Sequence, residues 1–280
     1  MTSWFRALPP RRKGFLGGVA LLAVAAICVL AVSISVSGGQ ANDEGAQPAG
    51  QEARPAQDDL GPVILVPGYG GDRSALLKLA VRIRATGRTA IVMHLPGNGT
   101  GSLIRGAAAL NQTVRAALRG GAPSVDVVGY SAGGVTTLIW ARDDDGARVA
   151  RRIVTLGSPF HGTALAAAAE GFAPGACPTG CLQLLPGSSL LDTLGARVPG
   201  QIPWLSLWSV DDQIVQPPTS ARLTGATDVA IQSVCPAVRV SHENLPDDTV
   251  VANMVLQAIA AGPLHRPTTA ACDAGLSGGS

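Results

Sequence analysis

Residues 125–134 constrain the fold more than any other part of this chain. Their sequence, Val-Asp-Val-Val-Gly-Tyr-Ser-Ala-Gly-Gly, predicts a buried strand that ends in Gly-x-Ser-x-Gly and passes directly into a helix. Such a turn holds the serine hydroxyl above the sheet, and glycines flank it because a Cβ there would collide with the neighbouring strand and helix. Ser131 is therefore the candidate nucleophile, and the N–H of Ala132 would face an incoming carbonyl group.

A second match to the same five-residue pattern shows that context must decide. Residues 275–279, Gly-Leu-Ser-Gly-Gly, follow no predicted strand, and we interpret them as a flexible tail. Around Ser131, by contrast, strand-type residues precede the pattern, and residues 135–142 are long enough to continue as a helix.

Short apolar runs alternate with helical patterns along the rest of the chain. A parallel sheet covered by helices on both faces produces this alternation, because its strands are buried on both sides. Together with the turn at Ser131, it predicts an α/β protein of the α/β-hydrolase type, a single domain with a mostly parallel central sheet. Besides the elements around Ser131, we expect strands at residues 63–66, 90–94, 152–156, 205–208 and 238–240, and helices at residues 74–85, from Ser102 onward and at residues 247–260.

A serine hydroxyl needs a base to take its proton and a carboxylate to orient that base, and in this fold the acid precedes the histidine along the chain. His242 follows a short predicted strand and precedes the last predicted helix, so it is the candidate base. His94 precedes the serine, His161 has no suitable acid between it and the serine, and His265 lies in a proline-containing tail.

Two adjacent carboxylates, Asp211 and Asp212, follow the predicted strand at residues 205–209. In such a sheet, ligands bind beyond the carboxyl ends of the strands, so one of the pair would point toward the histidine and the other toward solvent. The residues alone leave that choice open. The three aspartates at residues 143–145 are typical of a solvated helix end, and Asp228 is a weaker alternative.

An oxyanion formed at the substrate carbonyl needs two N–H donors already in place. Ala132 supplies one, and the Pro-Gly-Tyr-Gly-Gly turn at residues 67–71 supplies the other, most naturally from Tyr69. This chemistry requires no cofactor. A metal site is not expected, because no second closely spaced Cys or His pair accompanies Cys177 and Cys181.

Together these segments resemble the secreted bacterial lipases of the small, class 2 type, similar to the minimal α/β-hydrolase lipases of bacilli and streptomycetes. The resemblance covers roughly residues 60–262. It rests on residues 63–71, 125–134, 154–163 and 209–215 and on the region of His242.

The resemblance implies roles for particular residues. The family places its acid in Ser-x-Asp-x-Ile-Val, which implies that Asp212 is the acid, and it implies that His161 is structural. Two positions depart from the family. Pro67 replaces a histidine before the oxyanion glycine, and Tyr130 stands where histidine is usual before the serine. Because both positions line the site, we expect Tyr130 to contact substrate, and the substrate preference stays open.

The N-terminal region has the order of an export signal. Basic residues at positions 6 and 11–13 precede an uncharged apolar run over residues 14–36, and small residues follow. The run is also long enough to span a bilayer, so cleavage near residues 39–41 and retention as a membrane anchor both stay open. In either case we expect a secreted or cell-surface-anchored protein, with membrane contact through residues 14–36 if they are retained.

Charge narrows the range of partners. Beyond residue 41 the chain has 17 basic and 19 acidic residues, a net charge of about −2. That balance gives no electrostatic surface for nucleic acid. We expect a monomer that acts on a lipid or small ester substrate.

Beyond the signal or anchor at residues 1–41, the chain is expected to contain a disordered linker at residues 42–59, a catalytic domain at residues 60–262 and a tail at residues 263–280. Residues 164–203 exceed what a minimal lipase needs, and their leucines would form either a cap over the site or buried core. Four of the five cysteines lie beyond residue 41, and an even number in the exported part of a chain suggests two disulfides. Proximity favours Cys177–Cys181, which leaves Cys235–Cys272 to tie the tail to the domain.

Three functions are compatible with these residues. The first is hydrolysis of carboxylic esters through a Ser131-Asp212-His242 triad and an acyl-enzyme intermediate, with acylglycerols or similar lipid esters as substrates. The second is acyl transfer at the cell envelope by the same triad. The third is a binding protein without catalysis, which would be expected to lack a triad member, and none is missing from the sequence.

Overall fold

The computed structural model describes residues 54–273. Six strands form one sheet in the order β2-β1-β3-β4-β5-β6, and every neighbouring pair is parallel. The predicted parallel α/β architecture is therefore confirmed, with the strand that leads to Ser131 near the centre of the sheet. The strands are β1 (Val63–Val66), β2 (Ala90–Val92), β3 (Val125–Tyr130), β4 (Ala150–Leu156), β5 (Trp204–Trp208) and β6 (Thr227–Ala230).

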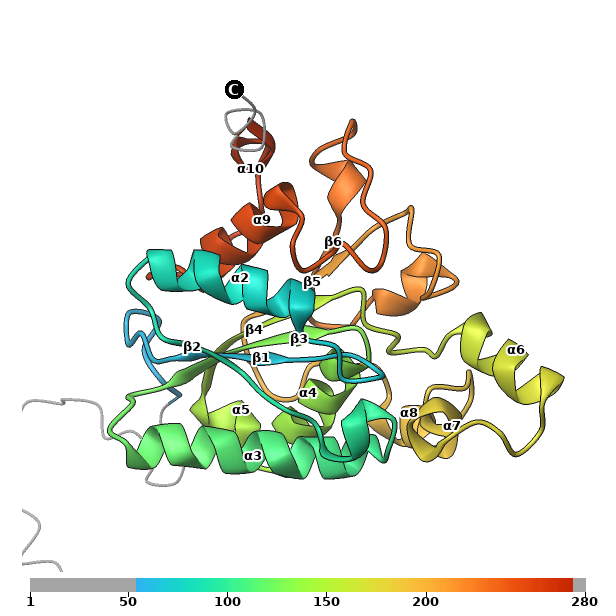
Figure 1. Cartoon of the computed structure of the whole chain (residues 1–280). Coiled ribbons are helices and arrows are strands. Elements are labelled where there is room, and N and C mark those ends of the chain that lie inside the picture. The colour runs from blue at the N-terminus through green and yellow to red at the C-terminus, as the bar shows by residue number, and fades with distance from the viewer. Residues whose placement is uncertain (1–53, 274–280) are drawn as a thin grey trace, which may run out of the picture. The chain divides into compact units, whose positions relative to one another are not determined.

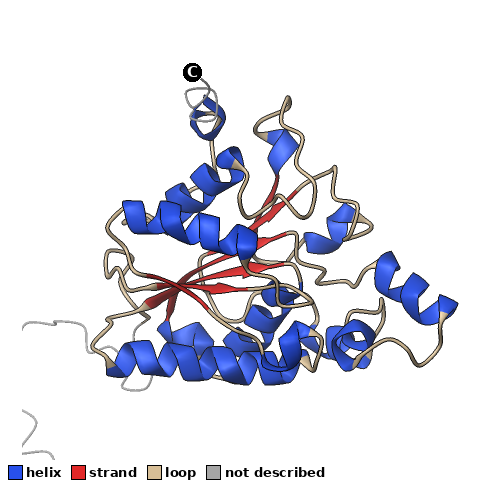
Figure 2. Ribbon diagram, in the orientation of Figure 1, coloured by secondary structure: helices blue, strands red, loops and turns tan. Residues whose placement is uncertain are grey.

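Helices cover both faces of the sheet (Figure 1), which lies between two helical layers (Figure 2). Helices α2 and α9 pack on one face, and α3, α4 and α5 lie on the other. The helices are α2 (Ser74–Ala85), α3 (Leu103–Arg119), α4 (Ala132–Asp143), α5 (Gly146–Val149), α6 (Ala164–Phe172), α7 (Thr179–Gln183), α8 (Ser189–Leu194), α9 (Thr249–Ile259) and α10 (Ala270–Asp273). Short 3-10 helices occupy Pro96–Gly99, Pro218–Ala221 and Ile231–Ser233.

The apolar run of β1 shows why both faces are covered. Val63 and Leu65 belong to the core under α2 and α9, whereas Ile64 and Val66 belong to the core under α3 and α4. All four side chains are fully buried. Successive strand residues point to opposite faces, so an apolar run without alternation is buried only when helices cover both faces.

The structure corrects the sequence-based prediction at the last strand. Residues 238–240 form no strand, and the sixth strand is β6, which pairs with β5. The carbonyl of Val240 accepts a hydrogen bond from the Ser209 hydroxyl at 2.6 Å rather than from a neighbouring strand. The Val-Arg-Val alternation is typical of a strand, whereas β6 (Thr-Asp-Val-Ala) lies at the sheet edge and buries only Val229 fully, so its sequence carries a weak apolar signal.

The prediction of a linker at residues 42–59 is wrong for its last six residues. The guanidinium of Arg54 donates to the carbonyls of Ala147 and Ala150, and the Gln57 carbonyl accepts from Arg151 at 2.8 Å. These contacts hold residues 54–59 against the amino end of β4. The remainder of the predicted linker and the apolar run at residues 14–36 lie outside the described residues. Within residues 54–273, none of the helices combines the length and apolarity needed to cross a membrane.

A buried ionic cluster lies at the amino end of the sheet. The Asp126 carboxylate on β3 is fully buried, and it pairs with Arg88 at 2.6 Å and with the fully buried Arg151 on β4 at 2.9 Å. Both arginines also donate to the carbonyl of Ile259, at the end of α9, where the helix dipole favours positive charge. The cluster joins four segments of the chain that are far apart in sequence.

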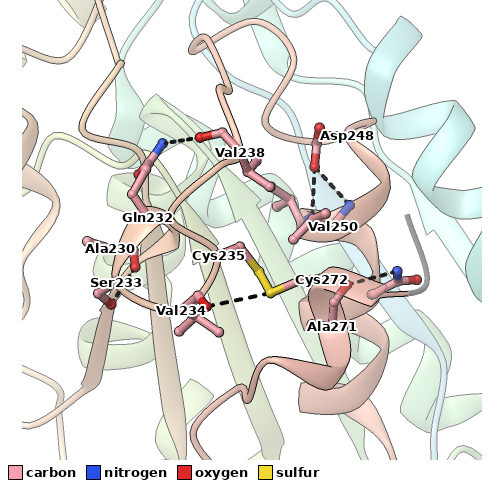
Figure 3. Close-up of a disulfide and its surroundings, with 12 residues drawn as sticks. Ala230, Gln232, Ser233, Val234, Cys235, Val238, Asp248, Val250, Ala271 and Cys272 are labelled. Carbon is pink, nitrogen blue, oxygen red and sulfur yellow. Dashed lines mark hydrogen bonds between the residues drawn. A yellow bond between two sulfur atoms is a disulfide. The ribbon is translucent and has the colours of Figure 1, made fainter. Parts of the chain in front are cut away.

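Both disulfides pair as proximity in the sequence suggests. Cys177 bonds to Cys181 within the segment between α6 and α8, and Cys235 bonds to Cys272 on α10. Figure 3 shows the second bond beside the start of α9, where the Asp248 carboxylate accepts hydrogen bonds from the first turn of that helix. The C-terminal segment is thus tied to the domain at Cys272.

Candidate active site

The turn between β3 and α4 places Ser131 in a strained conformation. Its φ of 53° and ψ of −127° lie in a region that residues other than glycine rarely adopt, at a cost of about 1–3 kcal/mol. The Ser131 N–H donates to the carbonyl of Leu156 at 2.8 Å, and its carbonyl accepts from Gly134 at 2.9 Å. The surrounding backbone therefore holds this strained turn, as expected of a serine presented above a sheet.

Close backbone packing explains the two glycines around the serine. A Cβ on Gly129 would stand 2.7 Å from the Cα of Gly134 in α4, and a Cβ on Gly133 would stand 2.3 Å from the carbonyl oxygen of Val66. Neither distance is sterically acceptable. The collisions with helix and strand that the motif predicts are therefore present in the structure.

Ser131 is connected by hydrogen bonds to a buried histidine and a buried aspartate. The Ser131 Oγ lies 2.9 Å from His242 Nε2, and His242 Nδ1 lies 2.7 Å from Asp212 Oδ2. His242 is 4% exposed and Asp212 is 2% exposed, so water competes little for their hydrogen bond. The three residues come from the ends of β3 and β5 and from the loop before α9, in the chain order Ser, Asp, His.

The loop after β5 fixes the orientation of the aspartate. Asp212 Oδ1 accepts hydrogen bonds from the backbone N–H groups of Ile214 at 2.9 Å and Val215 at 2.8 Å, which leaves Oδ2 for the histidine. Thr163 holds this loop from the other side by donating to the carbonyl of Ile214 at 2.6 Å. Thr163 was not a candidate from sequence reasoning, because its only local signal is the capping of α6.

Gly157, at the end of β4, leaves room for the Asp212–His242 pair. A Cβ there would stand 3.1 Å from Asp212 Oδ2, 3.2 Å from His242 Nδ1 and 2.6 Å from Leu245. Its φ of 54° also favours glycine. The sequence contains this glycine in the Gly-Ser-Pro-Phe-His-Gly-Thr segment, but nothing local marks it as a residue of the site.

The competing candidates lie elsewhere. Asp211 is exposed and accepts a hydrogen bond from the Gln232 amide at 3.2 Å. Asp228 is in β6, where it accepts from the backbone of Leu223. The three other histidines, at positions 94, 161 and 265, are exposed. Among the residues that the structure describes, no group of three or more His, Cys, Asp or Glu side chains is placed to hold a metal ion.

The two expected oxyanion donors lie beside the serine. Ala132 is the first residue of α4, so its N–H has no acceptor within the helix. The turn that carries Tyr69 approaches from β1, since a Cβ on Gly68 would stand 3.0 Å from the Cβ of Ser131. Tyr69 and Ser131 also line the same cavity.

That cavity has a volume of about 320 Å³, and its lining is mostly apolar. The segment at residues 164–203 supplies much of the wall, including both sulfur-bearing residues of the first disulfide. Other leucines of the segment, Leu191 and Leu194 on α8, belong to the buried core. The segment therefore contributes both to the cavity wall and to the buried core. The lining residues are Tyr69, Ser131, Pro159, Thr163, Leu165, Ala166, Ala169, Ala176, Cys177, Pro178, Cys181, Leu184, Ile214 and Val215.

Tyr130 contacts the histidine of the site. It is absent from the lining of the cavity next to Ser131, and its ring instead packs against His242, with centroids 5.2 Å apart. Its hydroxyl donates to the carbonyl of His242 at 3.2 Å. Burial raises the pKa of the Tyr130 phenol, and the negative charge of Asp212 adds to the effect. The structure thus shows Tyr130 in contact with the histidine, and the expected contact with substrate stays a prediction.

Neither a model of a known protein family nor a curated protein sequence matches this chain. Solved structures do match. Aspergillus fumigatus lipase B aligns with a TM-score of 0.63 over 85% of this chain and 64% of its own, at 18% identity. The chain has the α/β-hydrolase fold. Bacillus licheniformis lipase BlEst2 aligns in its propeptide form with a TM-score of 0.61 at 19% identity, over 78% of this chain and 53% of its own.

The mature form of the same Bacillus lipase aligns with a TM-score of 0.52 at 20% identity, over 66% of this chain and 84% of its own. In the alignment with the Aspergillus lipase, this chain spans 64% of the length of that protein. Identities of 20% or less establish a common fold, and the chemistry has to be argued from the site itself.

Proposed function

We propose that this protein is an exported serine hydrolase that cleaves carboxylic esters with an apolar acyl chain. The observation that carries the proposal is the hydrogen-bonded series Ser131–His242–Asp212, which opens into an apolar cavity. A serine, a histidine and a buried carboxylate at these distances form the arrangement required for nucleophilic attack on an acyl carbon.

In the first half of the reaction, Ser131 Oγ attacks the ester carbonyl carbon while His242 Nε2 takes the hydroxyl proton. Asp212 orients the imidazole and stabilises the positive charge that forms on it. The N–H groups of Ala132 and Tyr69 stabilise the negative charge on the carbonyl oxygen. When the intermediate collapses, His242 returns the proton to the departing alcohol and the acyl group stays on Ser131.

In the second half, His242 takes a proton from a water molecule, and the resulting hydroxide attacks the acyl carbon. Collapse of that intermediate releases the carboxylic acid, and His242 returns the proton to Ser131 Oγ. The same two N–H groups serve both halves, because negative charge develops on the same oxygen atom each time.

The shape and lining of the cavity support an apolar acyl chain as the substrate part next to Ser131. Small side chains at Ala166, Ala169 and Ala176 leave space along the wall, and Leu165 and Leu184 make it apolar. Burial of each methylene contributes about 0.8 kcal/mol, so such a wall favours a fatty acyl group over a short or polar one. Acylglycerols and similar lipid esters fit this description. The two disulfides support export to an oxidising compartment.

The test is hydrolysis of p-nitrophenyl esters from C2 to C16 by the purified protein and by its Ser131→Ala variant. We expect hydrolysis by the wild type, with an optimum at medium or long chains, and a loss of about 10⁵–10⁶-fold in kcat for the variant. Circular dichroism of both proteins controls for folding.

Equal activity in the two proteins would exclude Ser131 as the nucleophile. No hydrolysis at any chain length by a folded wild type would contradict ester hydrolysis. Addition of an alcohol acceptor would then distinguish acyl transfer, which yields a new ester, from a protein without catalysis.

A further inference from the structure

His242 lies in a stretch of chain without regular hydrogen-bonded structure. Residues 234–248 contain neither a helix nor a strand. The imidazole must nevertheless stay within hydrogen-bond reach of Ser131 Oγ, because a misplacement of about 1 Å can cost about 10²-fold in rate. Turns stabilise the loop locally, and one of them donates a hydrogen bond from the Leu245 N–H to the His242 carbonyl at 3.2 Å. Side chains from other elements also contact His242 and hold it against the rest of the site.

Tyr130 makes the most direct of these contacts. It precedes Ser131 at the end of β3, and its hydroxyl donates to the main-chain carbonyl of His242 at 3.2 Å. Its ring also contacts the imidazole itself, with an interplanar angle of 35°. One side chain thus touches both the backbone and the ring of the histidine, and it belongs to the residue adjacent to the nucleophile.

A second side chain contacts the same residue through its N–H. Gln213 Oε1 accepts a hydrogen bond from the backbone N–H of His242 at 3.3 Å. Gln213 follows Asp212 directly, just as Tyr130 directly precedes Ser131. The N–H of His242 is therefore bound by the side chain next to Asp212, and its carbonyl is bound by the side chain next to Ser131.

We propose that Tyr130 is a positioning residue that holds His242 against Ser131, with Gln213 as its counterpart on the other side of the His242 backbone. This role rests on the proposed function. It assigns Tyr130 to the histidine loop rather than to substrate recognition. The role requires the phenol to remain a donor, and burial raises the pKa of Tyr130, so the hydroxyl stays protonated at the pH values at which such an enzyme works.

The test compares Tyr130→Phe with the wild type by steady-state kinetics on the same ester series. Phenylalanine keeps the ring contact and removes only the hydroxyl. We expect kcat to fall by about 3- to 10-fold at every chain length, the range for one neutral hydrogen bond, with KM changed less than about 2-fold. Tyr130→Leu, which also removes the aromatic contact, should lower kcat further, and Gln213→Ala should act in the same direction as Tyr130→Phe.

Thr113→Val is the matched control. It also deletes a hydroxyl that donates to a main-chain carbonyl, that of Ala109 at 3.0 Å, but on α3, which contributes no residue to the cavity lining. We expect its kinetics to match the wild type. Thermal midpoints of all variants separate loss of folded protein from loss of rate per folded molecule.

Labelling by a fluorophosphonate separates this proposal from the proposed function. In that reaction Ser131 Oγ displaces fluoride from phosphorus and needs the histidine but no ester substrate. We expect the wild type to be labelled, and Tyr130→Phe to be labelled more slowly by about the same factor as its fall in kcat.

The possible results separate the positioning role from the proposed function. Equal labelling rates and equal kcat in the wild type and Tyr130→Phe would overturn the positioning role and leave the proposed function intact. A KM that rises with chain length at unchanged kcat would assign Tyr130 to substrate binding instead. If the folded wild type is neither labelled nor hydrolytic, the proposed function and the positioning role are both wrong.

Discussion

Strand β3 has a polar cluster at each end, and the two clusters are built in opposite ways. At its start, the Asp126 carboxylate pairs with two arginines and is completely buried. At its end, Ser131 contacts His242 and faces a cavity of about 320 Å³. The first cluster is closed by the fold, whereas the second is open on the side where a substrate would bind.

The backbone differs in the same way. At the amino end, the arginines donate to main-chain carbonyls at the end of α9, so the charges also serve to join elements. At the carboxyl end, Ser131 has a strained φ of 53°, which the fold has to compensate. The comparison indicates that one end of the strand stabilises the domain and that the other end uses part of that stability to hold Ser131 in a strained turn beside the cavity.

The largest expected effect is at the carboxyl end. Asp212→Asn should lower kcat by about 10⁴-fold while the free energy of unfolding changes little, because the amide can still accept from Ile214 and Val215 but no longer stabilises a charged imidazole. Ester kinetics together with urea unfolding measure both quantities. Asp211→Asn, at the exposed neighbour, is the control and should retain the wild-type kcat. A similar loss in both variants would contradict the assignment of Asp212.

The next effect is at the amino end and concerns stability. Asp126→Asn should lower the free energy of unfolding by about 3–5 kcal/mol, because Arg88 and Arg151 would keep buried charges without a carboxylate. Activity per folded molecule should be unchanged. The matched control is Asp247→Asn, which removes a more exposed pair with Lys78 and should cost about 1 kcal/mol or less. A fall in kcat for Asp126→Asn without a loss of stability would overturn the division between the two ends.

The smallest of the three effects is at Gly157. Gly157→Ala should lower kcat by about 10²-fold, because the new methyl would displace Leu245 and crowd the Asp212–His242 pair. Gly87→Ala is the control for backbone strain, since Gly87 also has a positive φ, of 85°, but no atom lies within 4 Å of its added Cβ. If both variants lose stability equally and neither loses kcat, Gly157 serves only the backbone.

Much of the fold follows from the sequence because the signals are local. The apolar runs of β1 and β3, the helical spacing of α3 and the turn at Ser131 each lie within a short stretch. The C-terminal region shows the limit of such signals. Residues 238–240 alternate like a strand but form a loop, because the sheet edge is already occupied by β6, and pairing across a sheet is not visible in either segment alone.

The sequence by itself determined the parallel α/β architecture and the turn that carries Ser131, since each depends on neighbouring residues. It favoured, among three possible pairings, the two cysteine pairs that the structure bonds. The resemblance already implied Asp212 as the acid, and the tertiary structure shows that this residue contacts His242. Only the tertiary structure decided that Tyr130 contacts the histidine and that Asp126 pairs with Arg88 and Arg151. The partners of Asp126 are 38 and 25 residues away along the chain. Contacts of that kind depend on how strands and helices pack, and packing is a property of the whole domain rather than of any one segment.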